Sequence, residues 1–159
     1  MTALSPQLEV ALATSIKSAS HPNGFTPAQE SQLRAAIAND QRVLDRLNED
    51  AEKGYLRSFE IASHGSHNML GAYNKSNGNV TLPVDSFSHA SNLNATLRVQ
   101  DMSMQFAHVT ITDETTHVQQ QVTQEMIGNL CKMPSMARRY LSSRYPACRI
   151  APCAASNHS

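Results

Sequence analysis

Two short clusters in the sequence combine residue types that can ligate a metal ion. His64 and His67 are separated by a glycine and a serine, and Glu114 and His117 have the Glu-x-x-His spacing that places two ligands on one helical face. Neither cluster has a third ligand at a fixed spacing, and the small polar residues between the ligands are typical of solvated loops. We therefore assign no catalytic, cofactor-binding or metal-ligating residue, and zinc enters only an alternative interpretation.

Other kinds of site are more weakly indicated. No G-x-S-x-G segment occurs, so a serine nucleophile on a strand-to-helix turn is not predicted. The last part of the chain interleaves basic with aromatic side chains, which can neutralise phosphates and stack on bases. These residues are Arg138, Arg139, Tyr140, Arg144, Tyr145 and Arg149. The three cysteines (Cys131, Cys148 and Cys153) are odd in number and lack a C-x-x-C pair, so we predict neither a disulfide framework nor a zinc site.

The composition of the chain changes abruptly after Leu130. Residues 1–130 contain all thirteen acidic residues against eight Lys and Arg, a formal charge of −5. The last 29 residues contain no acidic residue, five basic residues and all three cysteines. The overall charge of zero is therefore the sum of two unlike pieces.

Length and hydropathy predict one soluble domain with a thin core. The 159 residues include no Trp, four Phe and four Tyr, and 40% of them are hydrophobic. The first ten residues lack the basic and apolar regions of a signal peptide, and no apolar run approaches the roughly 18 residues of a membrane span. We expect no membrane partner, and either a cytoplasmic location or export by a signal-peptide-independent secretion system.

Helical signals dominate the first third of the chain. Ser5 followed by proline begins a short helix that reaches about residue 18. The segment Thr26-Pro27-Ala28-Gln29 is typical of a capping box, and Asp40 can begin a further helix. Gly54 ends that helix, because glycine adopts the left-handed conformation at a helix C-terminus at low cost.

After Gly54 the apolar period changes from 3.6 to 2. Tyr55 to Ile61 alternates as a strand with one buried face, and residues 69–82 form a hairpin around Asn77-Gly78. Residues 95–108 fit a helix better than a competing strand pattern, and Thr123 caps another helix. The predicted fold is therefore α+β: N-terminal helices packed on a small antiparallel sheet containing a hairpin, with a further helix near 95–108.

Part of this pattern resembles a known family. The run Asn94 to His108, followed by Val122 to Met126, resembles a segment of large bacterial effector-like proteins that are linked to type VI secretion spikes. Leu56 to Phe59, Gly71 to Asn74 and Val80 to Pro83 fit the strand and hairpin pattern of that family. The resemblance covers residues 25 to about 130.

The resemblance implies a function without supplying a site. In the family, a helix–strand–hairpin unit occurs twice, and the second copy leads into a helix with an HExxH zinc-peptidase-type motif. Residues 25–130 resemble the first copy and the opening of the second, and no HExxH occurs in the 159 residues. The family's metal site therefore cannot be transferred to any position, whereas a secretion-system spike is the implied partner.

The domain prediction has three parts: an N-terminal helix and linker (1–24), an α+β module (25–121), and a truncated start of a second repeat with a basic tail (122–159). If the reading frame starts at the third base of each codon, the Met133/Pro134 junction must encode Ala and the Met136/Ala137 junction must encode Gly. With permitted codon choices, the shifted sequence would continue residues 122–130 as an amphipathic helix and a turn, of the kind that the resembled family has there. We hypothesise that the last 29 residues are out-of-frame and disordered. Sequencing the gene tests this, because the absence of a homologous shifted frame downstream would contradict it.

Three interpretations of function follow. The leading one is a non-catalytic remnant or accessory module of a secreted effector with a metallopeptidase-like region, which assists folding or positions a substrate. The first alternative is a small metal-dependent peptidase or cell-wall hydrolase acting through His64, His67, Glu114 or His117. The second is a nucleic-acid or protein interaction module with a basic tail. The missing HExxH motif favours the non-enzymatic interpretation.

Overall fold

The computed structural model of the chain describes residues 3–17, 21–62, 70–109, 111–113, 118–120, 122–149 and 153. They belong to two compact units, unit 1 (Met1–Asp101) and unit 2 (Met102–Ser159). This division differs from the predicted boundaries at residues 24/25 and 121/122. The boundary between the units falls inside the helix Ala90–Ala107, because one unbroken helix can contribute residues to two compact units.

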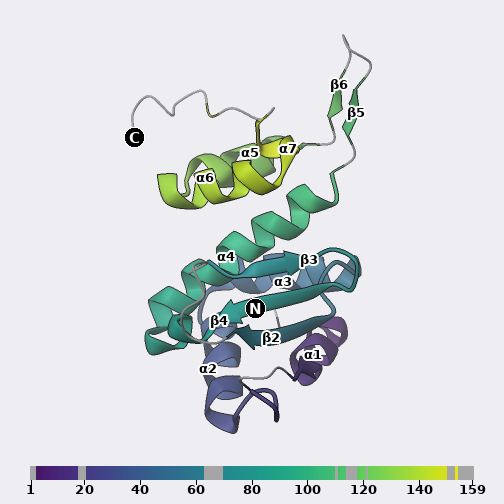
Figure 1. Ribbon diagram of the computed structural model, residues 1–159. Helices are drawn as coiled ribbons and strands as arrows, with labels where there is room; N and C mark the ends of the chain where they lie inside the picture. Colours follow the sequence, from purple (N-terminus) through teal and green to yellow (C-terminus); the bar gives the residue numbers. More distant parts are fainter. Residues whose placement is uncertain are drawn as a thin grey trace. The chain divides into compact units, whose positions relative to one another are not determined.

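Unit 1 contains the sheet and the helices that cover it (Figure 1). Its elements are α1 (Pro6–Ala13), β1 (Ser15–Ile16), α2 (Pro27–Ala38), α3 (Gln41–Glu52), β2 (Ser58–Ala62), β3 (Ala72–Asn74), β4 (Asn79–Pro83), the 3-10 helix η1 (Val84–Ser88) and the part of α4 (Ala90–Ala107) up to Asp101. The predicted helix near 95–108 is confirmed as α4, which begins at Ala90.

The predicted helix starts of unit 1 are confirmed by their capping hydrogen bonds. The Ser5 hydroxyl accepts from the backbone N–H of Leu8 at 3.1 Å. Thr26 and Gln29 form the reciprocal capping box, with hydrogen bonds of 3.1 and 3.0 Å. One carboxylate oxygen of Asp40 accepts from the first backbone N–H groups of α3, the nearer at 3.0 Å. Each cap pairs backbone donors that a helix cannot satisfy internally.

The sheet has the strand order β1-β2-β4-β3. The β3–β4 hairpin is antiparallel, as predicted, but β2 pairs in parallel with both β1 and β4. The α+β class is therefore confirmed, whereas the expectation of a purely antiparallel sheet is wrong. The reason is topological: the chain leaving β2 crosses to the far edge to form β3, and β4 then returns between them.

Two glycines fix the geometry of the hairpin. Gly78 has φ +70° at the predicted Asn-Gly turn, and Gly71 has φ +84° just before β3. A Cβ atom at Gly71 would collide with the backbone carbonyl oxygen of Thr81 on β4. Gly71 thus allows β3 to lie against β4, where a larger residue would push the strand away.

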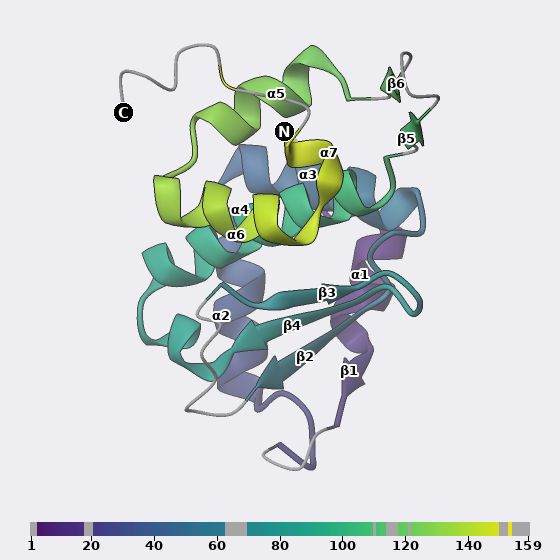
Figure 2. The ribbon, with the colours of Figure 1, turned by 45° about the horizontal axis from the view of Figure 1, so that its top comes forward.

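The core of unit 1 lies between the sheet and its helices. Phe59, Ile61, Val80 and Leu82 alternate along β2 and β4 and are at most 2% exposed. Figures 1 and 2 show α1, α2 and α3 on one side of the sheet, where Leu8, Leu33, Leu47 and other apolar side chains complete the core. Among the described helices of unit 1, none lies over the opposite face, which Figure 2 turns toward the viewer.

Unit 2 contains the β5–β6 pair (Ile111–Asp113 and Val118–Gln120) and the helices α5 (Gln124–Cys131), α6 (Ser135–Arg144) and α7 (Pro146–Arg149). The prediction of a disordered tail is wrong for 135–149, because α6 and α7 bury Leu141, Ala147 and Cys148. Thr123 caps α5 as predicted, its hydroxyl accepting from the Met126 N–H at 3.1 Å.

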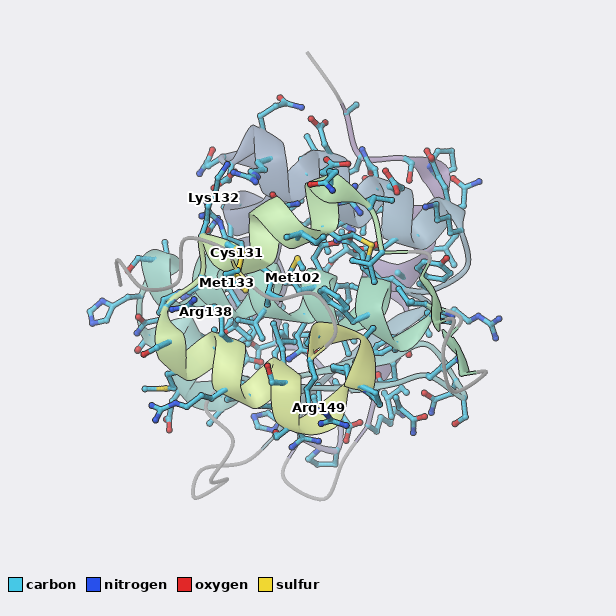
Figure 3. The ribbon with its side chains drawn as sticks, turned by 90° about the horizontal axis from the view of Figure 1, so that it is seen from above. Met102, Cys131, Lys132, Met133, Arg138 and Arg149 are labelled. Atoms are coloured by element: carbon cyan, nitrogen blue, oxygen red, sulfur yellow. A yellow bond between two sulfur atoms is a disulfide. The ribbon has the colours of Figure 1, made fainter. Side chains whose placement is uncertain are left out.

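A disulfide closes unit 2, contrary to the expectation from the sequence. Cys131 at the end of α5 is bonded to Cys153, 22 residues further along the chain (Figure 3). Cysteine counting misses this pair because the third cysteine, Cys148, is a buried free thiol that makes the total odd.

Within the residues that the structure describes, no helix is both long enough and apolar enough to cross a membrane.

Candidate functional site

The face of the sheet opposite the helices carries polar side chains from several strands. Strand alternation buries Phe59 and Val80 and turns their neighbours to this side. Two rungs of cross-strand neighbours make up the face: Ile16, Glu60, Thr81 and Ala72 in the first, and Ser58, Asn79 and Asn74 in the second. We call these seven residues the polar face.

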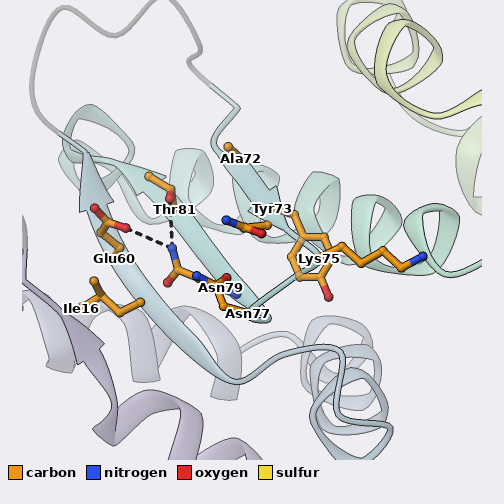
Figure 4. Close-up of a pocket in the computed structure, with 9 residues that line it drawn as sticks. Ile16, Glu60, Ala72, Tyr73, Lys75, Asn77, Asn79 and Thr81 are labelled. Carbon is orange, nitrogen blue, oxygen red and sulfur yellow. Dashed lines mark hydrogen bonds between the residues drawn. The ribbon is translucent and has the colours of Figure 1, made fainter.

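The Asn79 side chain organises the polar face (Figure 4). Its Oδ1 accepts from the Ser58 hydroxyl at 3.1 Å, and its Nδ2 donates to Glu60 Oε1 at 3.0 Å and to Thr81 Oγ1 at 3.4 Å. The residue is only 5% exposed, so this buried amide has its hydrogen-bonding groups satisfied by these three neighbours. Asn79 thereby fixes the orientation of the Glu60 carboxylate, as preorganised binding sites require.

A groove of about 500 Å³ lies over the polar face and extends to Lys75 and Asn77 in the hairpin loop. This volume falls in the range of small-molecule sites. Tyr73 also lines it, with its hydroxyl donating to the Tyr55 carbonyl oxygen at 2.5 Å. All the lining residues belong to unit 1.

The groove offers hydrogen-bonding groups rather than reactive ones. Its lining contains one carboxylate (Glu60), one ammonium (Lys75), several amides and one threonine hydroxyl. General acid–base catalysis with carboxylates commonly uses a pair, one as the acid and one as the base or nucleophile. A single carboxylate held by an amide is better suited to accepting hydrogen bonds from a ligand than to such chemistry.

A second titratable cluster is buried between α3 and α4. Asp50 is 0% exposed and Asp101 is 5% exposed, and Arg46 reaches both. Arg46 Nε lies 3.4 Å from Asp101 Oδ2, and an Arg46 terminal nitrogen lies 3.9 Å from Asp50 Oδ1. Burial, followed by the adjacent Asp101 carboxyl group, raises the pKa of Asp50 well above its usual value. The cluster joins two helices of unit 1 and does not reach the groove.

A smaller cavity of about 350 Å³ lies where the end of α2 meets the start of α4. Asp40 lies at its edge and accepts from Arg98 at 2.8 Å and from Asn94 at 3.1 Å. The Arg98 hydrogen bond is the main reason that the pKa of Asp40 is lowered. Because the same carboxylate caps α3, Asp40 has a structural role here.

The metal ligands considered from the sequence (His64, His67, Glu114 and His117) all lie outside the described residues. Within the described part of the chain, no group of three or more His, Cys, Asp or Glu side chains could hold a metal ion.

Two basic residues of the tail make contacts inside unit 2. The Arg144 guanidinium lies over the Tyr140 ring, 4.7 Å from its centroid, and Arg149 donates to the Ser142 carbonyl oxygen at 2.6 Å. Figure 3 shows Arg138 in α6 and Arg149 at the end of α7. These interactions hold helical side chains in place, so they do not by themselves form a phosphate-binding surface.

Sequence reasoning missed Glu60, Asn79 and Thr81 as site residues. The alternation after Gly54 placed Glu60 on the face opposite Phe59, which was a usable signal. Alternation does not give the register between strands. Glu60 lies beside Thr81 because β2 pairs in parallel with β4.

Comparison with known proteins found no matching family model, no matching curated protein and no matching solved structure.

Proposed function

We propose that the chain is a non-catalytic accessory module of a secreted bacterial effector, and that it positions a ligand on the polar face of its sheet. The observation that carries this proposal is the arrangement around Asn79. A buried amide holds the single carboxylate of the groove beside a threonine hydroxyl, on two paired strands. This arrangement binds without supplying an acid–base pair.

The core of unit 1 supports the same proposal. The two central strands bury their apolar side chains on the side of the helices, so the polar side chains of the opposite face can hold a ligand without any loss of core packing. The effector context comes from the resemblance of residues 94–108 and 122–126 to type VI secretion-linked proteins. Under that context, the expected partner is a secretion-system spike or the parent effector.

Metal content and turnover test the non-catalytic part of the proposal. The full chain is purified, dialysed with excess zinc and then without it, and its bound zinc is measured by mass spectrometry. Hydrolysis of an unstructured protein and of a bacterial cell-wall preparation is followed with and without zinc. We expect less than stoichiometric zinc and no hydrolysis above the buffer background.

The four sequence candidates provide the controls for this experiment. Stoichiometric zinc that disappears in His64→Ala or His117→Ala, together with hydrolysis lost in the same variants, would contradict the non-catalytic proposal. His89→Ala is the matched control, because His89 is an exposed histidine outside both candidate clusters.

A further inference from the structure

We infer that the groove over the polar face binds a short neutral saccharide. This inference deepens the proposed function and rests on it, since it names the class of ligand that the module would position. It follows from the charges, the hydrogen-bonding groups and the small aliphatic content of the lining.

The charges of the groove favour a ligand without net charge. Glu60 is the one carboxylate of the lining and Lys75 its one ammonium, so their formal charges cancel. A phosphate or nucleotide is usually held by several cationic or backbone N–H donors, and a calcium ion by six or more oxygen ligands. One Lys and one carboxylate satisfy neither requirement.

The hydrogen-bonding groups match those of a polyhydroxyl ligand. Each sugar hydroxyl both donates and accepts, so it needs a surface where acceptors and donors lie close together. Glu60 Oε1 is held by Asn79, and Glu60 Oε2 has no hydrogen bond from the described residues, which leaves it open to a donating hydroxyl. On the hairpin side, the exposed Asn74 and Asn77 use their amide oxygens within the turn, and their Nδ2 groups supply donors.

The aliphatic part of the lining is small. Ile16 and Ala72 stand at the two ends of the rung that contains Glu60 and Thr81. Such side chains can contact the C–H groups of one sugar ring, but they are too few to bury a large apolar ligand, for which sites are mostly hydrophobic. The small aliphatic content and the polarity of the lining thus agree on a hydroxylated molecule.

Binding is tested with the full chain and defined probes. Chitotriose, cellotriose and maltotriose are titrated separately into isotope-labelled protein, and backbone amide shifts are followed by NMR. Inorganic phosphate and diglycine serve as probes of the anionic and zwitterionic classes. We expect saturable shifts for at least one trisaccharide at Glu60, Asn74 and Asn79, and none for phosphate or diglycine.

Two substitutions locate the site. Glu60→Gln keeps the size of the side chain and an acceptor for Asn79, but removes the charge, and should weaken trisaccharide binding about tenfold or more. Thr81→Val, which removes one hydroxyl, should weaken it less. Glu52→Gln makes the same chemical change at an exposed position on α3 and should bind as the unmodified chain does. Circular dichroism confirms that each variant is folded.

The outcomes separate this inference from the proposed function. If no trisaccharide shifts these amides, if phosphate or diglycine shifts them instead, or if Glu60→Gln and Glu52→Gln bind equally well, the saccharide inference is overturned while the zinc and turnover results still stand. If a trisaccharide binds and is also cleaved, the saccharide inference is supported and the non-catalytic proposal fails.

Discussion

Asp50 shows how a single buried carboxyl group sets the pH dependence of unit 1. Its side chain is fully buried, and the Asp101 carboxyl group lies beside it. Burial and this neighbour raise its pKa, so the folded chain binds the Asp50 proton more tightly than the unfolded chain does. The stability from this proton is fully present below the unfolded pKa of about 3.9 and is lost as pH rises through the raised folded pKa.

Replacing Asp50 with asparagine should therefore stabilise the protein at pH values at which the buried carboxyl group would be charged. The introduced amide resembles the protonated acid and can still donate to Asp101. We expect Asp50→Asn to raise the free energy of unfolding at pH 8 by on the order of 1 kcal/mol. The gain should be smaller at pH 5. Urea denaturation followed by circular dichroism at both pH values measures the difference.

Asp45 on the same helix provides the control. Its side chain is exposed and accepts from Gln41 at 2.8 Å, so Asp45→Asn removes a carboxylate that water already solvates. This variant should change stability little and equally at the two pH values. The burial argument fails if Asp50→Asn and Asp45→Asn show the same pH dependence.

At the scale of elements, local signals in the sequence were sufficient for the starts of α1, α2 and α3. They were wrong for the end of α1, which lies at Ala13 rather than near residue 18, because β1 (Ser15–Ile16) follows it. The Ser5, Thr26 and Asp40 caps and the alternation around Phe59 depend on residues within one turn or one strand, so the sequence displays them directly. The parallel pairing of β2 with β4 depends instead on a crossover between residues far apart in the chain. No local pattern encodes that crossover, which is why the sheet was predicted to be antiparallel.

The candidate groove was missed for the same reason. Glu60 and Asn79 are 19 residues apart, and their hydrogen bond exists only because β2 and β4 are neighbours. The metal ligands that the sequence suggested were chosen from short spacings, which favour motifs contained in one loop or helix. A site assembled from several strands has no such spacing, so it becomes visible only in the folded sheet.

At the scale of the whole molecule, the two units differ in what stabilises them. Unit 1 has a sheet whose two central strands bury their apolar side chains, whereas the short helices of unit 2 are closed by the Cys131–Cys153 bond. Burial raises the pKa of the free Cys148 thiol to about 12, so very little thiolate forms at neutral pH to attack that bond. The disulfide should therefore persist in the absence of an added reductant.

Reduction of this disulfide should destabilise unit 2 selectively. Opening a loop of 22 residues restores chain entropy to the unfolded state, which corresponds to about 3 kcal/mol in the chain-entropy description. Two electrons and two protons from dithiothreitol yield the Cys131 and Cys153 thiols and the cyclic oxidised reagent. We expect amides in α5 and α6 to exchange with deuterium much faster after reduction, while amides in α2 and α3 keep their protection.

Mass spectrometry of the same sample reports both units, so α2 and α3 serve as an internal standard. Cys153→Ser should reproduce the effect without reductant, which separates loss of the bond from side effects of the reagent. Cys148→Ala should leave deuterium exchange in α5 as it is in the unmodified chain, because this variant keeps the disulfide and changes only a small buried side chain. Equal protection of α5 and α6 in the oxidised, reduced and Cys153→Ser proteins would show that packing alone holds unit 2 together.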